Sequence, residues 1–207
     1  MCPIHRTQGD PVAVLPDMAE VTDSDETLML RYAAGDARAF EVLYRRHELR
    51  LWRFICRSVS DRAVADELLQ DVWYSIVQAA PRYQPVARFT TWAFTLAHNR
   101  LIDRHRASKS VRRLDAAIDN CEPSLEQLAT EASADPAYQA ESAQQLAVLV
   151  AALEQLPSEQ RAAFLLQAEG DLSVEEIALA TGVSFETAKS RLRYARARLK
   201  QLLQELV

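Results

Sequence analysis

The residue pattern with the clearest chemical meaning lies in the last third of the 207-residue chain, between Ser173 and Leu199. Ser173 and Glu176 have the spacing of a capping box, which marks the start of a helix. Gly182 supplies the positive φ that a tight turn between two helices requires. A second helix follows from Ser184. The pattern therefore predicts a helix-turn-helix, a unit that places its second helix in the major groove of DNA.

This second helix carries two stripes of opposite character. A stripe of Lys and Arg is usually only a solvated helix face, but here it occurs in one register with the capping box and the glycine turn. We expect the apolar stripe to dock on a core and the basic stripe to face a polyanion. The apolar stripe consists of Ala188, Leu192, Ala195, Leu199, Leu202 and Leu206, and the basic stripe of Lys189, Arg193, Arg196 and Lys200.

The composition is that of a helical globular protein, with 49% hydrophobic residues and only four glycines. No apolar run approaches the length of a membrane span, so no membrane insertion is predicted. The first residues also lack the apolar core of a signal peptide. Three widely spaced cysteines (Cys2, Cys56 and Cys121) imply no disulfide framework. A cytoplasmic location is the simplest expectation.

The net charge of −5 is unusual for a protein that binds DNA, but the charge is unevenly distributed. Residues 82–113 contain eight Lys or Arg and one acid, whereas residues 114–160 contain nine acids and no base. Residues 186–200 again contain six bases and one acid. Two basic blocks separated by an acidic one suggest two polyanion-binding surfaces joined by a charged connector.

Hydrophobic periodicity predicts helices throughout, and no strand-like alternation stands out. Helices are expected from about Ser24 to the Gly35–Asp36 break, from Asp36, from about Asp61 to Pro81, and from about Thr90. A second group is expected from about Gln139, with a break at Pro157 and a new helix from Ser158. The predicted fold is all-α, with two small helical domains joined by an acidic linker and a helix-turn-helix in the C-terminal one. The expected divisions are a flexible tail (1–23), a first domain (24–107), the linker (108–138) and a second domain (139–207).

Three segments of the first half carry further motifs that bear on function. They are Ser24 to His47, the sequence Asp66-Glu-Leu-Leu-Gln-Asp-Val-Trp73, and Phe89-Thr-Thr-Trp92 followed by Leu96 to Arg106. Together with the helix-turn-helix, they resemble the extracytoplasmic-function sigma factors. These are the small members of the sigma-70 family, which direct bacterial RNA polymerase to promoters. The resemblance covers roughly residues 24–107 and 140–200, and it implies one domain for the −10 promoter element and one for the −35 element.

The resemblance implies that one helix of the first domain docks on core RNA polymerase. Its residues there are Asp66, Glu67, Gln70, Asp71 and Trp73. Carboxylates and an amide beside apolar groups suit an Arg-rich partner helix, because charge-assisted hydrogen bonds set the register around an apolar contact. A simpler alternative for the first acids is that they only stabilise the start of the helix through its dipole.

The next segment is expected to read and open the −10 element. Strand opening requires groups that stack on bases, cations for the backbone and polar groups for base edges. Asn99 is the natural group for a base edge, and Asp103 is expected to orient Arg100 or Arg106 through an intrahelical pair. A lone helical Trp is more often a core residue, so the DNA role of Trp92 competes with a packing role. The predicted set is Trp92, Asn99, Arg100, Arg104 and Arg106.

The −35 element is expected to be read from the helix-turn-helix, with residues 185–196 in the major groove. The sequence departs from the family pattern at Glu186, Ala188 and Tyr194, which leaves open which bases are read. Glu186 could accept a hydrogen bond from a cytosine amino group. The predicted contacts are Ser184, Glu186, Thr187, Lys189, Ser190, Arg191, Arg193 and Arg196.

The predicted function is therefore that of a sigma factor that binds core polymerase and promoter DNA, with an anti-sigma factor as the family's usual regulator. A stand-alone helix-turn-helix regulator is the alternative, but it leaves residues 66–73 and 89–106 without a purpose. An enzyme is not expected, because the histidines show no metal-site spacing and the chain has no phosphate loop or nucleophile motif. No cofactor or metal is predicted. The acidic linker could fold back on the basic domains, or it could serve only solubility.

Overall fold

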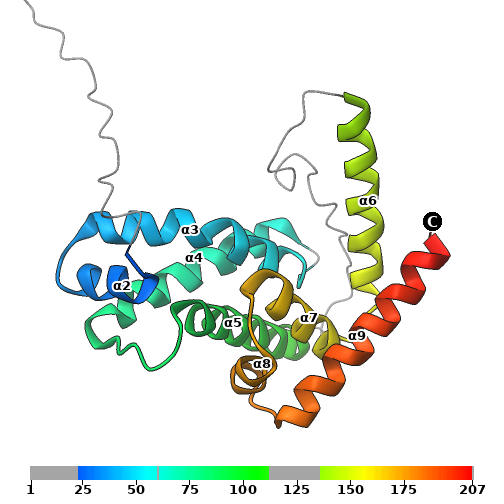
Figure 1. The fold of residues 1–207 in the computed structure, drawn as a ribbon. Helices are drawn as coiled ribbons and strands as arrows, with labels where there is room; N and C mark the ends of the chain where they lie inside the picture. Colours follow the sequence, from blue (N-terminus) through cyan, green and yellow to red (C-terminus); the bar gives the residue numbers. More distant parts are fainter. Residues whose placement is uncertain (1–22, 60, 112–135, 207) are drawn as a thin grey trace, which may run out of the picture.

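The computed structural model describes residues 23–59, 61–111 and 136–206, which contain helices and no strand. The all-α prediction is confirmed (Figure 1). Residues 1–22 of the tail and residues 112–135 of the predicted linker lie outside the described residues, and Cys2 and Cys121 are among them. The fold-back hypothesis therefore concerns residues that the structure does not describe. The helices are α2 (Asp25–Ala33), α3 (Ala37–Cys56), α4 (Arg62–Ala79), the short η1 (Ala80–Arg82), α5 (Phe89–Val111), α6 (Pro136–Glu154), α7 (Ser158–Gly170), α8 (Val174–Thr181) and α9 (Phe185–Leu206).

Polar caps set the starts of the first three helices where the sequence predicts them. The side chain of Ser24 accepts from the amide of Thr27 at 3.2 Å. Asp36 caps α3 and Asp61 caps α4 in the same way, at 3.1 and 2.8 Å. Each bond satisfies one of the amides that a helix leaves without a partner in its first turn. These three boundaries are local properties of the sequence.

The start of α5 depends on a distant residue. The backbone amide of Phe89 donates to the carboxylate of Glu26, which lies 63 positions earlier, at 2.6 Å. Helix α5 therefore begins slightly before the predicted Thr90 and is fastened to α2. It also continues to Val111, past the predicted domain end at residue 107, while α6 begins at Pro136 rather than near Gln139. Proline fits the first turn of a helix because no hydrogen bond from its nitrogen is needed there.

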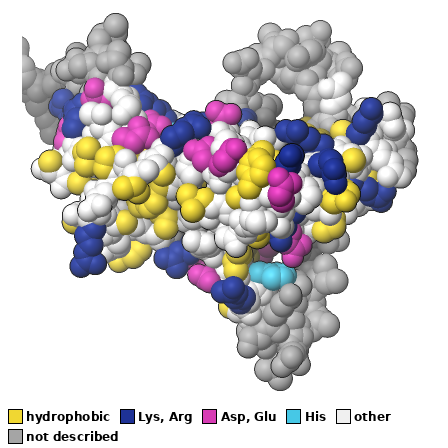
Figure 2. Space-filling view, turned by 60° about the horizontal axis from the view of Figure 1, so that its bottom comes forward, with side chains coloured by type: hydrophobic (Ala, Val, Ile, Leu, Met, Phe, Trp, Pro, Cys, Tyr) yellow, Lys and Arg dark blue, Asp and Glu magenta, His cyan; other side chains and the backbone are white. Residues whose placement is uncertain are grey.

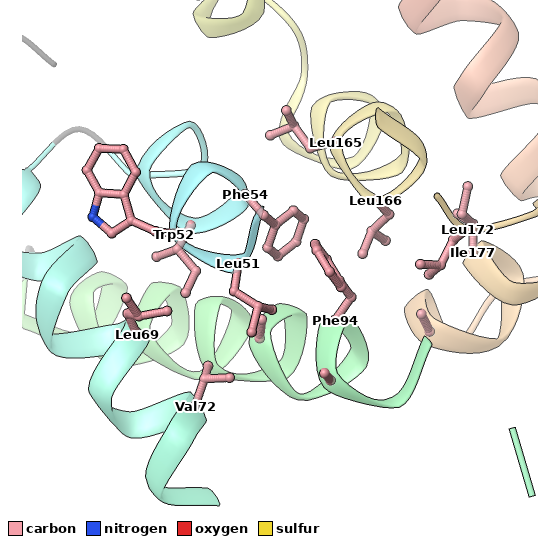
Figure 3. Packing of buried hydrophobic residues seen from close by; sticks show 14 of the residues in the cluster. Leu51, Trp52, Phe54, Leu69, Val72, Phe94, Leu165, Leu166, Leu172 and Ile177 are labelled. Carbon is pink, nitrogen blue, oxygen red and sulfur yellow. The ribbon is translucent and has the colours of Figure 1, made fainter. Parts of the chain in front are cut away.

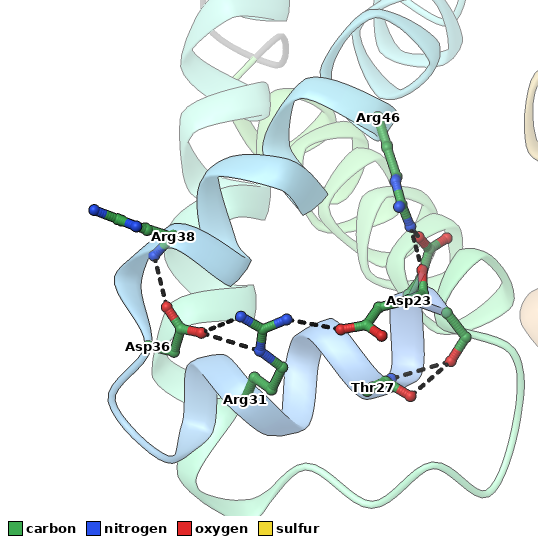
Figure 4. Close-up of polar contacts among 8 residues, drawn as sticks. Asp23, Thr27, Arg31, Asp36, Arg38 and Arg46 are labelled. Atoms are coloured by element: carbon green, nitrogen blue, oxygen red, sulfur yellow. Dashed lines mark hydrogen bonds and ion pairs between the residues drawn. The ribbon is translucent and has the colours of Figure 1, made fainter. Parts of the chain in front are cut away.

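A network of ion pairs holds α2 against the start of α3 (Figure 4). The guanidinium of Arg31 lies between two carboxylates, at 2.7 Å from Asp23 and 2.6 Å from Asp36. Its hydrogen bond holds the pKa of Asp36 below the ordinary value. Asp25 accepts from Arg46 at 2.8 Å and pairs with the buried His47 at 2.7 Å. The cap of α3 is thus also part of the contact between the two helices.

The helix-turn-helix forms as predicted. Ser173 and Glu176 make both bonds of a capping box, at 3.2 and 2.8 Å. Gly182 ends α8 with φ +66°, a left-handed conformation that glycine adopts without steric cost. The predicted apolar stripe of α9 is buried at Ala188, Leu192, Ala195, Leu199 and Leu202, each at most 4% exposed.

The two halves of the chain share one hydrophobic core. Phe54 of α3 and Phe94 of α5 lie with ring centroids 5.4 Å apart, and Leu165 and Leu166 of α7 pack beside them (Figure 3). Helix α7 lies against α3 and α5, and α8 lies against α5. Helices α6 and α9 pack on each other and project to one side (Figure 1). The predicted domains therefore lie in direct contact in this structure.

His98 is buried in α5, with only 8% of its surface exposed. Burial lowers its pKa, and the nearby positive charge of Arg191 in α9 lowers it further. The folded protein therefore keeps this imidazole neutral at pH values where the unfolded chain protonates it.

Replacing Ser173 by Ala is expected to lower the free energy of unfolding by about 1 kcal/mol, because the amide of Glu176 loses its cap. Urea denaturation measures this change. Ser158→Ala is the matched control, since the hydroxyl of Ser158 donates to Glu159 instead of capping its helix. Equal losses in the two variants would contradict the assignment.

The protein is expected to lose stability as the pH falls below about 6.5, the ordinary pKa of His. In this pH range His98 is protonated in the unfolded chain but stays neutral in the folded protein, so a lower pH favours unfolding. The slope from one such group is at most about 1.4 kcal/mol per pH unit. His98→Gln should remove this part of the slope, whereas His105→Gln on the exposed end of α5 should not. Urea denaturation at a series of pH values distinguishes the variants, and parallel slopes in both would refute the prediction.

Candidate polymerase and promoter interfaces

An acidic and polar face runs along the exposed side of α4. Glu67, Gln70 and Asp71 are all exposed and lie at helical spacings of three and four residues. Tyr74 continues the same stripe and is 65% exposed. Tyr74 is not among the contacts predicted from the sequence, although its spacing from Gln70 and Asp71 indicates it. We call Glu67, Gln70, Asp71 and Tyr74 the α4 face.

Two of the predicted polymerase contacts occupy different environments. Trp73 is only 6% exposed, with its ring 5.6 Å from Phe40 and 4.8 Å from Tyr44. Asp66 is half-buried and accepts a hydrogen bond from the indole of Trp52 at 2.9 Å. Aromatic residues of α3 cover the side of α4 that carries Trp73. The structure therefore places Trp73 beneath the α4 face, as part of the core.

Trp92 packs at the start of α5. It is half-buried, with its ring 5.0 Å from Tyr83 and 5.7 Å from Phe89. Of the two roles that the sequence left open, this geometry supports packing. The remaining predicted −10 residues (Asn99, Arg100, Arg104 and Arg106) are all exposed along the second half of α5.

The arginines of α5 reach α4. Arg100 donates to the hydroxyl of Ser75 at 2.8 Å, and Arg104 lies 3.3 Å from the carboxylate of Glu67. The α4 face and the predicted −10 cations are therefore neighbours, and Glu67 of the α4 face pairs with Arg104. Arg106 pairs with Asp103 at 3.9 Å, which is one of the two alternatives predicted for Asp103. Cations and acids alternate over the face shown in Figure 2 rather than forming one continuous basic surface.

The predicted −35 residues lie at the start and along the outer side of α9. Ser184 caps the helix by accepting from the amide of Thr187 at 3.2 Å, and their hydroxyls are 2.8 Å apart. The hydroxyl of Ser190 donates to backbone carbonyls of α9 itself. Glu186, Lys189, Arg193 and Arg196 are exposed, whereas Thr187, Ser190 and Arg191 are half-buried.

Three of these cations are held by neighbouring side chains. Lys189 lies 5.7 Å from the ring of Phe185, and Arg193 lies 5.0 Å from the ring of Tyr194. Tyr194, one of the departures from the family pattern, is 54% exposed and thus supports a cation on the surface. Arg196 donates to the side chain of Gln167 in α7 at 2.5 Å.

An apolar groove lies behind this basic side, between α6, α7 and α9. Its volume is about 750 Å³, and its lining includes Leu149, Phe164, Leu199 and Leu203, with Arg196 and Lys200 at its edge. Within the described ranges, no group of three or more His, Cys, Asp and Glu residues could hold a metal ion. No helix in that part of the chain is both long and apolar enough to cross a membrane.

Two sequence families match the chain in the order of its two halves. Residues 43–111 match Sigma-70 region 2, and residues 146–199 match Sigma-70, region 4. The first range ends with α5 and includes the α4 face. The second contains α8, the turn at Gly182 and α9 as far as Leu199, which together form the helix-turn-helix.

Several curated relatives are similar over most of their length. The RNA polymerase sigma factor CarQ of Myxococcus xanthus is 35% identical over 86% of this chain and 97% of its own. The ECF RNA polymerase sigma factor SigM of Mycobacterium tuberculosis is 33% identical over 87% of this chain and 85% of its own. The ECF RNA polymerase sigma factor RpoE of Cereibacter sphaeroides is 33% identical over 89% of this chain and 98% of its own.

Solved structures share the fold. The sigma factor RpoE of Bartonella quintana, solved with the anti-sigma factor NepR, has a TM-score of 0.65 at 24% identity, covering 81% of this chain and 98% of that one. CnrH, solved with the cytosolic domain of CnrY, has a TM-score of 0.61 at 23% identity, covering 88% and 99%. With both promoter-reading regions matched in order and whole-length relatives at this identity, the chain belongs to the extracytoplasmic-function sigma factors of the sigma-70 family.

Proposed function

We propose that this sigma factor divides its three binding tasks among α4, α5 and α9. The α4 face docks on core RNA polymerase, the second half of α5 engages the −10 element, and the start of α9 reads the −35 element. The observation that carries this proposal is the adjacency of the acidic α4 face and the arginines of α5, joined by the Arg104–Glu67 pair. One side of the first half can thus serve both polymerase and DNA.

Docking through the α4 face follows from its exposed groups. Glu67 and Asp71 present carboxylates that can accept charge-assisted hydrogen bonds, and Tyr74 offers an apolar ring with a polar tip. This combination suits a partner helix that is rich in arginine. Trp73 and Asp66, which the sequence places in the same contact, would act from beneath by fixing α4 against α3.

The α5 surface suits single-stranded and melted DNA. Asn99 carries an amide that can bond a base edge, and the exposed arginines around it can neutralise phosphates. Trp92 supports this surface by packing on Tyr83. The ion pair between Arg104 and Glu67 is exposed to solvent and therefore weak. Arg104 can leave Glu67 and bind a DNA phosphate instead.

The start of α9 suits the major groove. Lys189 and Arg193 project from it over aromatic rings, and Glu186 stands exposed one turn earlier. The cap formed by Ser184 and Thr187 presents backbone amides at a helix N-terminus, where phosphate binds favourably. The apolar stripe on the opposite side of α9 packs on the core and so fixes the orientation of the helix and of its exposed side chains.

The protein would act by binding and positioning rather than by catalysis. A cytoplasmic location follows from the proposed binding to RNA polymerase. An anti-sigma protein is a further proposed partner. The two structural neighbours above were solved with the anti-sigma factor NepR and with the cytosolic domain of CnrY, respectively. Run-off transcription with purified core polymerase tests the whole function. Tight duplex binding without promoter-specific transcripts would favour a stand-alone regulator instead.

Asp71→Arg is expected to weaken binding to core polymerase by about tenfold, a loss of about 1.4 kcal/mol, because it turns an attraction to an Arg-rich surface into a repulsion. A titration of core polymerase with labelled protein measures the affinity. Glu175→Arg on the exposed side of α8 makes the same charge change outside the α4 face and should leave the affinity unchanged. Similar losses in both variants would argue against docking through α4.

Arg193→Ala is expected to weaken promoter binding by the holoenzyme and to reduce the salt dependence of log K by about one unit, as the loss of one phosphate contact does. Binding is measured at several salt concentrations. Arg45→Ala removes an exposed cation of the same kind from α3, where it pairs with Glu41, and should change neither quantity. An unchanged salt slope for Arg193→Ala would remove this residue from the DNA contact.

A further inference from the structure

Helix α9 presents two different flanks on its outer side. The first flank consists of four exposed cations, Lys189, Arg193, Arg196 and Lys200. The second flank carries Tyr194, which is 54% exposed although its ring is mostly apolar. None of the −35 contacts predicted from the sequence is a large apolar side chain. The ring of Tyr194 therefore has no task among the three binding tasks above.

Small residues surround Tyr194 on the helix surface. Ser190 lies four residues before it and Ala197 three residues after it, which are the spacings of neighbours on a helix. Both residues are also neighbours of Arg193, at spacings of three and four residues. The hydroxyl of Ser190 donates to backbone carbonyls of α9 itself. The long side chains of Arg193 and Tyr194 therefore project beyond the small side chains on both sides of them.

Arg193 and Tyr194 lie against each other. The guanidinium carbon of Arg193 is 5.0 Å from the centroid of the ring, and its Nη2 donates to the phenol oxygen at 3.4 Å. A cation over an aromatic face is attracted by the quadrupole of the ring. This contact holds one face of the ring against the cation, while more than half of the residue stays open to solvent.

The pair stands on the part of α9 that we propose for the major groove. Tyr194 lies nine residues after Phe185, which is about 13.5 Å along a helix at 1.5 Å per residue. The buried stripe, with Leu192 and Ala195 beside the pair, faces the core instead. Base edges in the major groove present hydrogen-bonding groups and one apolar group, the C5 methyl of thymine. That methyl group is the chemical match for an exposed ring.

We propose that Tyr194 is a specificity-determining residue whose ring contacts the C5 methyl of a thymine in the −35 element. Arg193, held over the ring, contacts the neighbouring phosphate. The inference rests on the proposed function, because it takes α9 as the −35 reader. Phosphate contacts position a protein on DNA, and base contacts specify the sequence. The two members of the pair thus divide these tasks, and the contact between them fixes the ring at a set distance from the backbone.

Selection from a pool of duplexes with randomised sequence identifies the base. Core polymerase saturated with the full-length protein selects from this pool, and the enriched sequences define the −35 element. The parent should enrich thymine at one position of that element, on either strand, and Tyr194→Ala should accept any base there. Tyr194→Arg should enrich guanine instead, because arginine bonds guanine through O6 and N7. Leu179→Ala, which removes a 72% exposed apolar side chain from α8, is the matched control and should select as the parent does.

Uracil substitution isolates the methyl group, because uracil keeps every hydrogen-bonding group of thymine. At the selected position, uracil should weaken binding of the parent holoenzyme about fourfold, as the loss of one buried methyl group does. It should not change the binding of Tyr194→Ala. Tyr194→Phe keeps the ring and should remain sensitive to uracil. 5-Methylcytosine at this position should bind about fourfold more tightly than cytosine in the parent, and equally in Tyr194→Ala.

The assignment is overturned if no thymine of the parent's element is sensitive to uracil, or if Tyr194→Ala shows the same sensitivity. A uniform loss of affinity across all sequences in Tyr194→Ala would also overturn it, since a backbone contact behaves in that way. Circular dichroism of each variant separates a lost contact from unfolding. If the parent holoenzyme still enriches a −35 sequence in these cases, only the role of Tyr194 fails. If it enriches none, the proposed function fails with it.

Discussion

The first half of α5 holds the molecule together, because it contacts both halves of the chain at once. Its first amide is capped by Glu26 of α2, and Phe94 packs on Phe54 of α3. The same segment also meets the second half of the chain, because the hydroxyl of Thr91 donates to Glu176 of α8 and the ring of Phe94 lies against Gly170 of α7. The first half of α5 is largely buried, whereas Asn99, Arg100, Arg104 and Arg106 farther along the helix are exposed.

The ion pairs of this protein are of two kinds, which differ in burial. Pairs that are buried and connect distant segments, such as Arg57 with Glu169, specify how the halves fit together. Leaving either partner alone would strand an uncompensated charge inside the protein. Exposed pairs, such as Arg104 with Glu67, hold side chains near a working position and break at little cost. The net negative charge of the chain therefore does not prevent a local attraction for DNA.

Features set by neighbouring residues could be predicted. The caps at Ser24, Asp36, Asp61 and Ser173 and the turn at Gly182 occur where their spacing indicates them. Features set by distant residues could not. Glu26 as the cap of α5, the burial of Trp73 beneath rings from α3 and the pairing of Arg104 with Glu67 all join segments that are separated in sequence.

The sequence by itself determined the helices, their order and the family, because caps, periodicity and short motifs act over one or two helical turns. Only the tertiary structure decided which side of each helix remains available. Trp73 is a motif residue that became core, while Tyr74 beside it reaches the surface. The pattern of α9, with one apolar and one basic stripe, is likewise set by the sequence. Its position relative to α5 follows from the contacts that Glu169 of α7 and Glu176 of α8 make with the other half. Such contacts depend on the packing of the whole chain, and no local spacing encodes them.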